Sequence, residues 1–230
     1  MSQLSKENFD FLIDLEKNNN RDWFTENKPR YEKNHQDIIA FADKLIAEMN
    51  QHDTIETPSG KKSLFRIYRD VRFSKDKSPF KTHWSGSFSR ATKLLRGGYY
   101  FHIQPGGNSF IGGGFWNPNK EDLQRIREDI ATDDSEMRSI LADKEFVTTF
   151  GGLSVHSEQL KTAPKGFDKE HPAVDLLRYK QFVVGTNFTD EQVLSEDFYQ
   201  LANDTFKKMR PFFDYMSEVL TTDSNGTPLF

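Results

Sequence analysis

The chain has 230 residues, a net charge of −4 and no Cys, and this length favours one domain over two. The lack of Cys excludes a disulfide scaffold, a cysteine nucleophile and a thiolate zinc site. No apolar run approaches the ~20 residues that span a bilayer, and the N-terminus does not resemble a signal peptide. We therefore expect a cytoplasmic protein, with an aromatic-rich interior because Phe occurs 21 times.

The N-terminal part of the sequence predicts three helices. Apolar residues recur at helical spacing, and Ser5, Asn20 and Pro29 suit the beginnings of helices. We expect these helices over residues 6–17, from residue 21, and from residue 29 to about residue 50, followed by a loop over 51–60.

The middle of the chain predicts strands. From Leu64 to Phe73 the apolar period changes to two, which predicts a strand with one polar face. The segment 74–85 is expected to be a loop. Segments 99–104 and 109–116 are expected to form a hairpin around the turn sequence 105–108. Gly112, Gly113 and Gly114 within that hairpin indicate close packing against Trp116 or a neighbouring helix.

Helices are expected again in the C-terminal half, apart from a short strand over 181–184. The last helix begins near Ser195 and continues past Pro211, where we expect a kink. Helices, then antiparallel hairpins, then helices indicate an α+β fold. We expect a single domain over residues 1–222, with a curved antiparallel sheet packed against the N-terminal and C-terminal helices, and a frayed tail over 223–230.

Three stretches of this sequence resemble the uncharacterised bacterial and fungal family catalogued as domain of unknown function 2461. They are Asn19 to Phe24 with Asn27, Lys28 and Tyr31; Phe65 to Lys81; and Gly98 to Ile103 with Gly112 to Gly114, Leu160 to Phe167 and His171-Pro172. The resemblance covers nearly the whole chain. It implies a single-domain cytosolic protein and brings no established activity, cofactor or catalytic residue.

Basic residues are concentrated in one part of the chain. Residues 61–96 hold eleven Lys or Arg and two acidic residues, a local sum of +9 that leaves −13 for the rest. Such a block either attracts an anion or neutralises acidic surface elsewhere in the fold.

The expected polar face of the first strand carries Arg66, Tyr68, Asp70 and Arg72. Arg grips phosphate or carboxylate through a planar fork, and a lysine-rich loop beside a sheet can close over an anion. The alternative is a solvated face on which Asp70 pairs with an Arg. The candidate anion-binding residues are Arg66, Arg69, Arg72, Lys75, Lys77, Lys81, Lys161 and Lys165.

The expected hairpin places Tyr100, His102 and Gln104 on one face, and with Tyr68 we expect Tyr100 and Gln104 to line the cleft. His102 is the best candidate for proton transfer, because its ordinary pKa of ~6.5 lies near working pH. Asp70 is the second catalytic candidate. A structural histidine, hydrogen-bonded within the sheet, is the competing interpretation.

No metal site is predicted, because the histidines are scattered without HExxH spacing. A site assembled by folding from Asp70, His83 and His102 stays an alternative. The sequence contains neither a G-x-S-x-G elbow nor a phosphate-binding glycine motif, and it indicates no particular cofactor or oligomeric state.

Three functions follow from these patterns. The first is binding of, or action on, a small anionic ligand, phosphorylated or nucleotide-like, in a cleft lined by Arg and Lys. The second is nucleic-acid binding, less favoured because the rest of the chain is acidic. Its expected stacking platforms are Phe65, Tyr68, Phe73, Phe80, Trp84 and Phe88. The third is a non-catalytic interaction protein whose basic segment neutralises a partner or its own acidic helices. None of the three involves a membrane.

Overall fold

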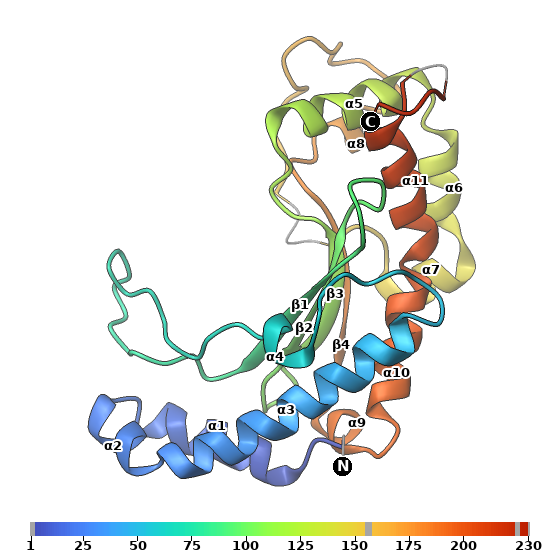
Figure 1. Cartoon of the computed structure of the whole chain (residues 1–230). Coiled ribbons are helices and arrows are strands. Elements are labelled where there is room, and N and C mark those ends of the chain that lie inside the picture. The colour runs from blue at the N-terminus through green and yellow to red at the C-terminus, as the bar shows by residue number, and fades with distance from the viewer. Residues whose placement is uncertain (1–2, 155–157, 224–225, 230) are drawn as a thin grey trace. The chain divides into compact units, whose positions relative to one another are not determined.

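A computed structural model of the chain describes residues 3–154, 158–223 and 226–229. The fold is α+β, as predicted, and its sheet is antiparallel and open (Figure 1). The strands follow one another in the order β1-β2-β3-β4. Their bounds are β1 Trp84–Ser89, β2 Gly98–Ile103, β3 Ser109–Phe115 and β4 Phe182–Phe188.

The helices begin where capping chemistry predicted. The Asn20 side chain accepts a hydrogen bond from the Trp23 amide, and Gly151 ends a helix with φ of 70°. Among the described residues, none of the helices is both long and apolar enough to cross a membrane. Their bounds are α1 Lys6–Lys17, α2 Arg21–Glu26, α3 Lys28–Met49, α4 Gly60–Ser63, α5 Lys120–Thr132, α6 Ser135–Ala142, α7 Lys144–Phe150, α8 Val174–Leu177, α9 Asp190–Leu194, α10 Phe198–Lys208 and α11 Arg210–Thr221.

The expected last helix is divided in two. Helix α10 ends at Lys208 and α11 begins at Arg210, with Pro211 in its first turn. Proline has no N–H to donate to the preceding turn, so the break lies just before it. In the expected tail, Thr222 and Pro228 form an isolated antiparallel bridge. Residues 224, 225 and 230 lie outside the described residues.

The chain forms two compact units whose boundaries fall within the four strands and within helix α10. The first unit comprises Met1–Phe88, Tyr100–Ile111 and Asn187–Asp204, and the second comprises Ser89–Tyr99, Gly112–Thr186 and Thr205–Phe230. A single domain over residues 1–222 stays a prediction.

Aromatic packing holds the first unit together. The buried ring of Phe41, on α3, meets Phe101 edge-on at 5.8 Å between centroids and stacks on Phe198 at 5.6 Å. Ile38 and Leu45 are fully buried on the same helix, as the helical spacing of these residues predicted. Through Phe101, this aromatic core packs helix α3 against strand β2.

In the second unit, helix α11 packs closely against β-strand residues. A Cβ at Gly113 would lie 2.8 Å from the Phe213 ring and 2.9 Å from the Gly98 carbonyl oxygen. Only glycine permits this approach, so the expected close packing against a neighbouring helix is present. Trp116, the alternative neighbour, is 66% exposed.

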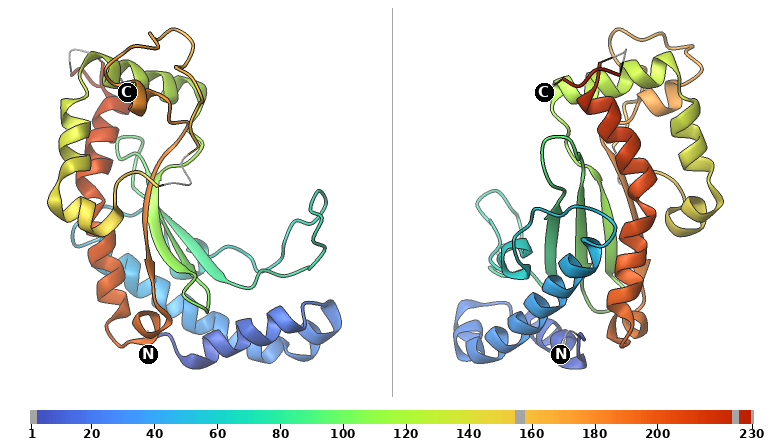
Figure 2. Two further views of the ribbon diagram at one scale, coloured as in Figure 1. Left: turned by 180° about the vertical axis from the view of Figure 1, so that it is seen from behind. Right: turned by 45° about the vertical axis from the view of Figure 1, so that its right-hand side comes forward.

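The prediction of a regular strand over residues 64–73 is wrong. Residues 64–83, which we call the basic arm, form a loop that doubles back on itself and projects beside β1 (Figures 1 and 2). Within the arm the main chain forms an isolated antiparallel bridge between Tyr68 and Phe80. The opposing segment contains Pro79, which cannot donate to a strand ladder.

The predicted two faces of that strand are absent as well. Phe65 is 49% exposed and Phe73 is 96% exposed, whereas Ile67, expected on the same face, is buried. Without a continuous ladder, alternation along the chain does not fix which side chains point toward the core.

Strand β1 lies where a loop was expected up to Ser85. Its sequence, Trp-Ser-Gly-Ser-Phe-Ser, has weak strand propensity. Gly86 compensates because a Cβ there would lie 2.6 Å from the Phe101 ring, so glycine lets the strand approach its neighbour. Strand β4 continues to Phe188, four residues beyond the expected end at Val184.

Candidate functional site

The first unit contains a hollow of about 420 Å³, which we call the arm hollow. It lies where the base of the basic arm meets the segment that follows α1. Its size falls within the range of small-molecule sites. The lining residues are Glu16, Asn19, Arg69, Asp76, Ser78, Phe80, Lys81, Thr82 and His83.

The base of the arm is held to the α1–α2 segment by an amide side chain. Asn19 donates from Nδ2 to the Phe80 carbonyl at 3.0 Å and accepts the Phe80 amide at Oδ1, at 3.1 Å. Phe24 stacks on the Phe80 ring at 4.0 Å between centroids. These contacts fix the inner end of the arm and therefore the wall of the hollow.

Two cations of the basic arm line the hollow. Arg69 forms an ion pair with Asp76, whose carboxylate also accepts the Ser78 amide at 2.9 Å and the Ser78 hydroxyl at 2.7 Å. The Ser78 hydrogen bonds and then Arg69 hold the pKa of the Asp76 carboxyl well below its usual range. Burial and the nearby Arg66 lower the pKa of Lys81.

A stacked pair of histidines lies beside these cations. The ring of His83 stacks on that of His102 at 4.1 Å between centroids. Burial, followed by His102, Lys81 and Arg69, lowers the pKa of His83 to about 3. His83 is therefore neutral at physiological pH.

His102 belongs to the polar row predicted on strand β2. Its Nδ1 lies 3.1 Å from the Tyr100 hydroxyl, and its Nε2 lies 2.8 Å from Gln104 Oε1. The hydroxyl donates to Nδ1 and the Nε2–H donates to the amide oxygen, which assigns one tautomer to a neutral ring. Burial lowers the pKa of His102, opposed by Gln104, and Phe110 stacks on the ring at 4.8 Å. His102 thus has both the hydrogen bonds of a structural histidine and a contact with the wall of the arm hollow.

The other candidate residues of the arm are distributed outside the hollow. Arg72 donates from Nε and Nη2 to the two oxygens of Asp70, at 3.0 and 2.7 Å, in an exposed ion pair. Lys77 Nζ donates to the Val71 carbonyl at 2.9 Å, and Lys75 is exposed. Asp70 therefore sits in the surface ion pair that the sequence left as the alternative.

Tyr68 lies at the side of the arm, 55% exposed, with its ring 5.4 Å from that of Phe80. Lys161 and Lys165 lie in the second unit and are exposed. Neither of these lysines lines the arm hollow.

Sequence reasoning assigned no anion-binding role to four polar residues that line the hollow, Asn19, Ser78, Thr82 and His83. One signal was available, because His83 follows Lys81 by two positions within the basic block. Asn19 gave no such signal, since its contact with Phe80 joins residues 61 positions apart.

No three His, Asp or Glu residues lie together as metal ligands within residues 3–154, 158–223 and 226–229. The alternative site from Asp70, His83 and His102 is therefore not assembled. The two histidines meet, but Asp70 pairs with Arg72 instead.

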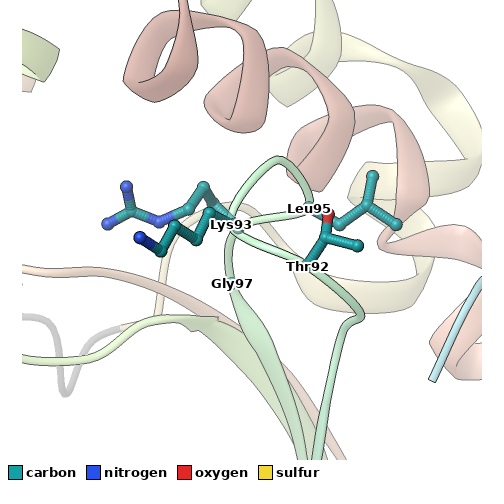
Figure 3. Close-up of a pocket in the computed structure, with 5 residues that line it drawn as sticks. Thr92, Lys93, Leu95 and Gly97 are labelled. Carbon is teal, nitrogen blue, oxygen red and sulfur yellow. The ribbon is translucent and has the colours of Figure 1, made fainter. Parts of the chain in front are cut away.

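A smaller hollow, of about 280 Å³, lies in the second unit. A single loop lines it, with Thr92, Lys93, Leu95, Arg96 and Gly97. The Lys93 side chain points away from those of Thr92 and Leu95 (Figure 3). Arg96 forms an ion pair with Asp122. Because Arg96 is already paired and this hollow is the smaller of the two, the arm hollow is the stronger candidate.

The chain is an α+β protein with an open antiparallel sheet and a long basic loop. The chain belongs to the family of conserved hypothetical proteins named DUF2461, whose model matches residues 7–215. This match confirms the resemblance seen in the sequence. No curated protein and no solved structure matches the chain.

Proposed function

We propose that the protein binds a small anionic ligand, phosphorylated or nucleotide-like, in the arm hollow, and that it does so in the cytoplasm. The observation that carries this proposal is that two cations, Arg69 and Lys81, line the same ligand-sized hollow. Burial is the main cause of the lowered pKa of His83, and both cations contribute to it, so a positive potential reaches the wall of the hollow. An anion bound there would be attracted by the same charges.

Lys81 is the residue best placed to meet the ligand. Burial and Arg66 lower the pKa of its ammonium group, and among the described residues no carboxylate forms an ion pair with it. Its ammonium group lies 5.4 Å from the centre of the Phe65 ring. A phosphate or carboxylate in the hollow would supply the missing counter-charge and would relieve the repulsion from Arg66.

The carboxylates of the hollow set a requirement on the ligand. Asp76 occupies part of the Arg69 guanidinium, and Glu16 also lines the space. An anion must therefore bind mainly through Lys81 or displace Asp76 from Arg69. Asn19 and Ser78 are already hydrogen-bonded to Phe80 and Asp76. The Thr82 hydroxyl, which also lines the hollow, can hydrogen-bond to the rest of the ligand.

The proposal is tested by calorimetric titration of the full chain with sulfate and with adenosine monophosphate. Lys81→Ala should weaken binding by about 10- to 100-fold, because a hydrogen bond to a charged group contributes ~1.5–3 kcal/mol. The matched control is Lys62→Ala, an exposed lysine on α4 in the same unit.

Binding that weakens in Lys81→Ala and not in Lys62→Ala supports a ligand site in the arm hollow. The proposal is wrong if neither anion binds the wild-type protein. Equal loss of affinity in the two variants would also refute it, since general charge would then explain the binding.

A further inference from the structure

The basic arm exposes large aromatic side chains along its outer surface. Phe65 is 49% exposed, Tyr68 is 55% exposed and Phe73 is 96% exposed. Single exposed apolar side chains are common, whereas three within nine residues of one projecting loop form a surface suited to a partner. We infer that this outer surface of the arm binds single-stranded nucleic acid.

The charge of the arm complements a polyanion. Residues 65–81 carry six Lys or Arg against two Asp, a sum of +4. Both carboxylates are already neutralised within the arm, Asp70 by Arg72 and Asp76 by Arg69. Of the four remaining cations, Lys81 lines the arm hollow. The other three, Arg66, Lys75 and Lys77, are exposed and act outward, toward phosphates of a bound strand.

Cations and aromatic rings alternate along the arm. The Arg72 guanidinium lies 5.9 Å from the centre of the Phe73 ring, and the Lys81 ammonium lies 5.4 Å from that of Phe65. Proteins that bind single strands combine these groups, because bases stack on the rings while nearby cations contact the backbone phosphates. Phe65 and Phe73 are thus stacking platforms with a cation close to each ring.

The spacing of the rings favours a nucleic-acid strand over a lipid surface. Phe73 lies near the outer turn of the arm, where the Ser74 amide donates to the Val71 carbonyl. Phe65 and Tyr68 lie eight and five residues before Phe73 along the arm. The rings are therefore distributed along the arm and not gathered at its outer turn, and successive bases of a strand can stack on rings distributed in this way.

The structure also corrects the set of stacking residues expected from the sequence. Phe80, Trp84 and Phe88 are 3%, 4% and 1% exposed. Core packing occupies these three rings, so they cannot stack on bases. The platforms are confined to Phe65, Tyr68 and Phe73.

The experiment measures the fluorescence anisotropy of a labelled twelve-residue oligothymidylate with the full-length protein. Phe73→Ala should weaken binding about five- to 100-fold, the range for loss of one base–aromatic stack. Trp116→Ala is the matched control, because Trp116 is 66% exposed and lies in the second unit, outside the arm. Phe73 is 96% exposed, so its removal leaves the core intact.

Two further measurements complete the test, the dependence of binding on salt concentration and binding to lipid vesicles. With three exposed, uncompensated charges, the logarithm of the binding constant should fall with the logarithm of salt concentration at a slope of about −2. Equal effects of Phe73→Ala and Trp116→Ala would overturn the inference. So would binding to phosphatidylserine vesicles without binding to the oligonucleotide.

The oligonucleotide result is independent of the small-ligand proposal. Binding that is abolished by excess sulfate and is insensitive to Phe73→Ala would place the phosphates in the arm hollow. That outcome would refute the docking surface and would leave the proposed small-anion site standing.

Discussion

Replacing His83 by Gln should make the stability of the protein less dependent on pH. The folded protein lowers the pKa of His83 from 6.5 to about 3, chiefly by burial. Below pH 6.5, His83 therefore binds a proton in the unfolded chain and does not bind it in the folded chain. The free energy of unfolding falls as the pH is lowered through this window, and the loss is complete near pH 3.

The size of the effect follows from the shift. Each pH unit below 6.5 costs ~1.4 kcal/mol for one proton, so that pH 5.0 lies about 2 kcal/mol below pH 7.0. His83 is only partly buried, and residual water reduces this value. We expect His83 to contribute about 1–2 kcal/mol to the loss of stability between pH 7.0 and pH 5.0.

Urea unfolding at pH 7.0 and pH 5.0 measures this contribution as the difference between wild type and His83→Gln. Carboxylates titrate mostly below this window and are shared by both proteins, so they cancel in the comparison. Equal loss of stability in the two proteins would show that burial at the arm hollow does not exclude the proton.

Two further substitutions test the hollow and the sheet. Asp76→Ala should strengthen sulfate binding several-fold, because it frees the Arg69 guanidinium; Asp70→Ala removes the same charge from an exposed ion pair and should have a smaller effect in the same titration. Gly86→Ala should destabilise the protein by ~1–3 kcal/mol in urea unfolding, because the new Cβ would overlap the buried Phe101 ring at 2.6 Å. A Gly86→Ala protein as stable as the wild type would refute the close approach of β1.

The helices could be predicted because their signals are local. Capping residues such as Asn20 and the spacing of Ile38, Phe41 and Leu45 define α2 and α3 without reference to the rest of the chain. Strand β1 could not be predicted in this way. Its stability depends on the fit of Gly86 against Phe101, which only the folded chain brings together.

The candidate site could be predicted only in part, because it too depends on contacts between distant residues. The basic block and the row on β2 were visible in the sequence, and the structure joins them through the stacked rings of His83 and His102. The alternation of apolar and polar residues over 64–73 predicted the wrong faces for these side chains, because the arm has isolated bridges in place of a strand ladder. The pairing of Asp70 with Arg72 depends on that local geometry and was left as an alternative.

The clamp between Asn19 and Phe80 has an evolutionary consequence. Both of its hydrogen bonds go to main-chain atoms of residue 80, so the clamp is indifferent to the side chain there and excludes only proline. The stack of Phe24 on the buried Phe80 ring constrains that side chain separately. Relatives are therefore free to vary the outer turn of the arm, provided that the asparagine and this stack are retained. Loss of the asparagine would release the inner end of the arm, and we expect the two sites to change together across the family.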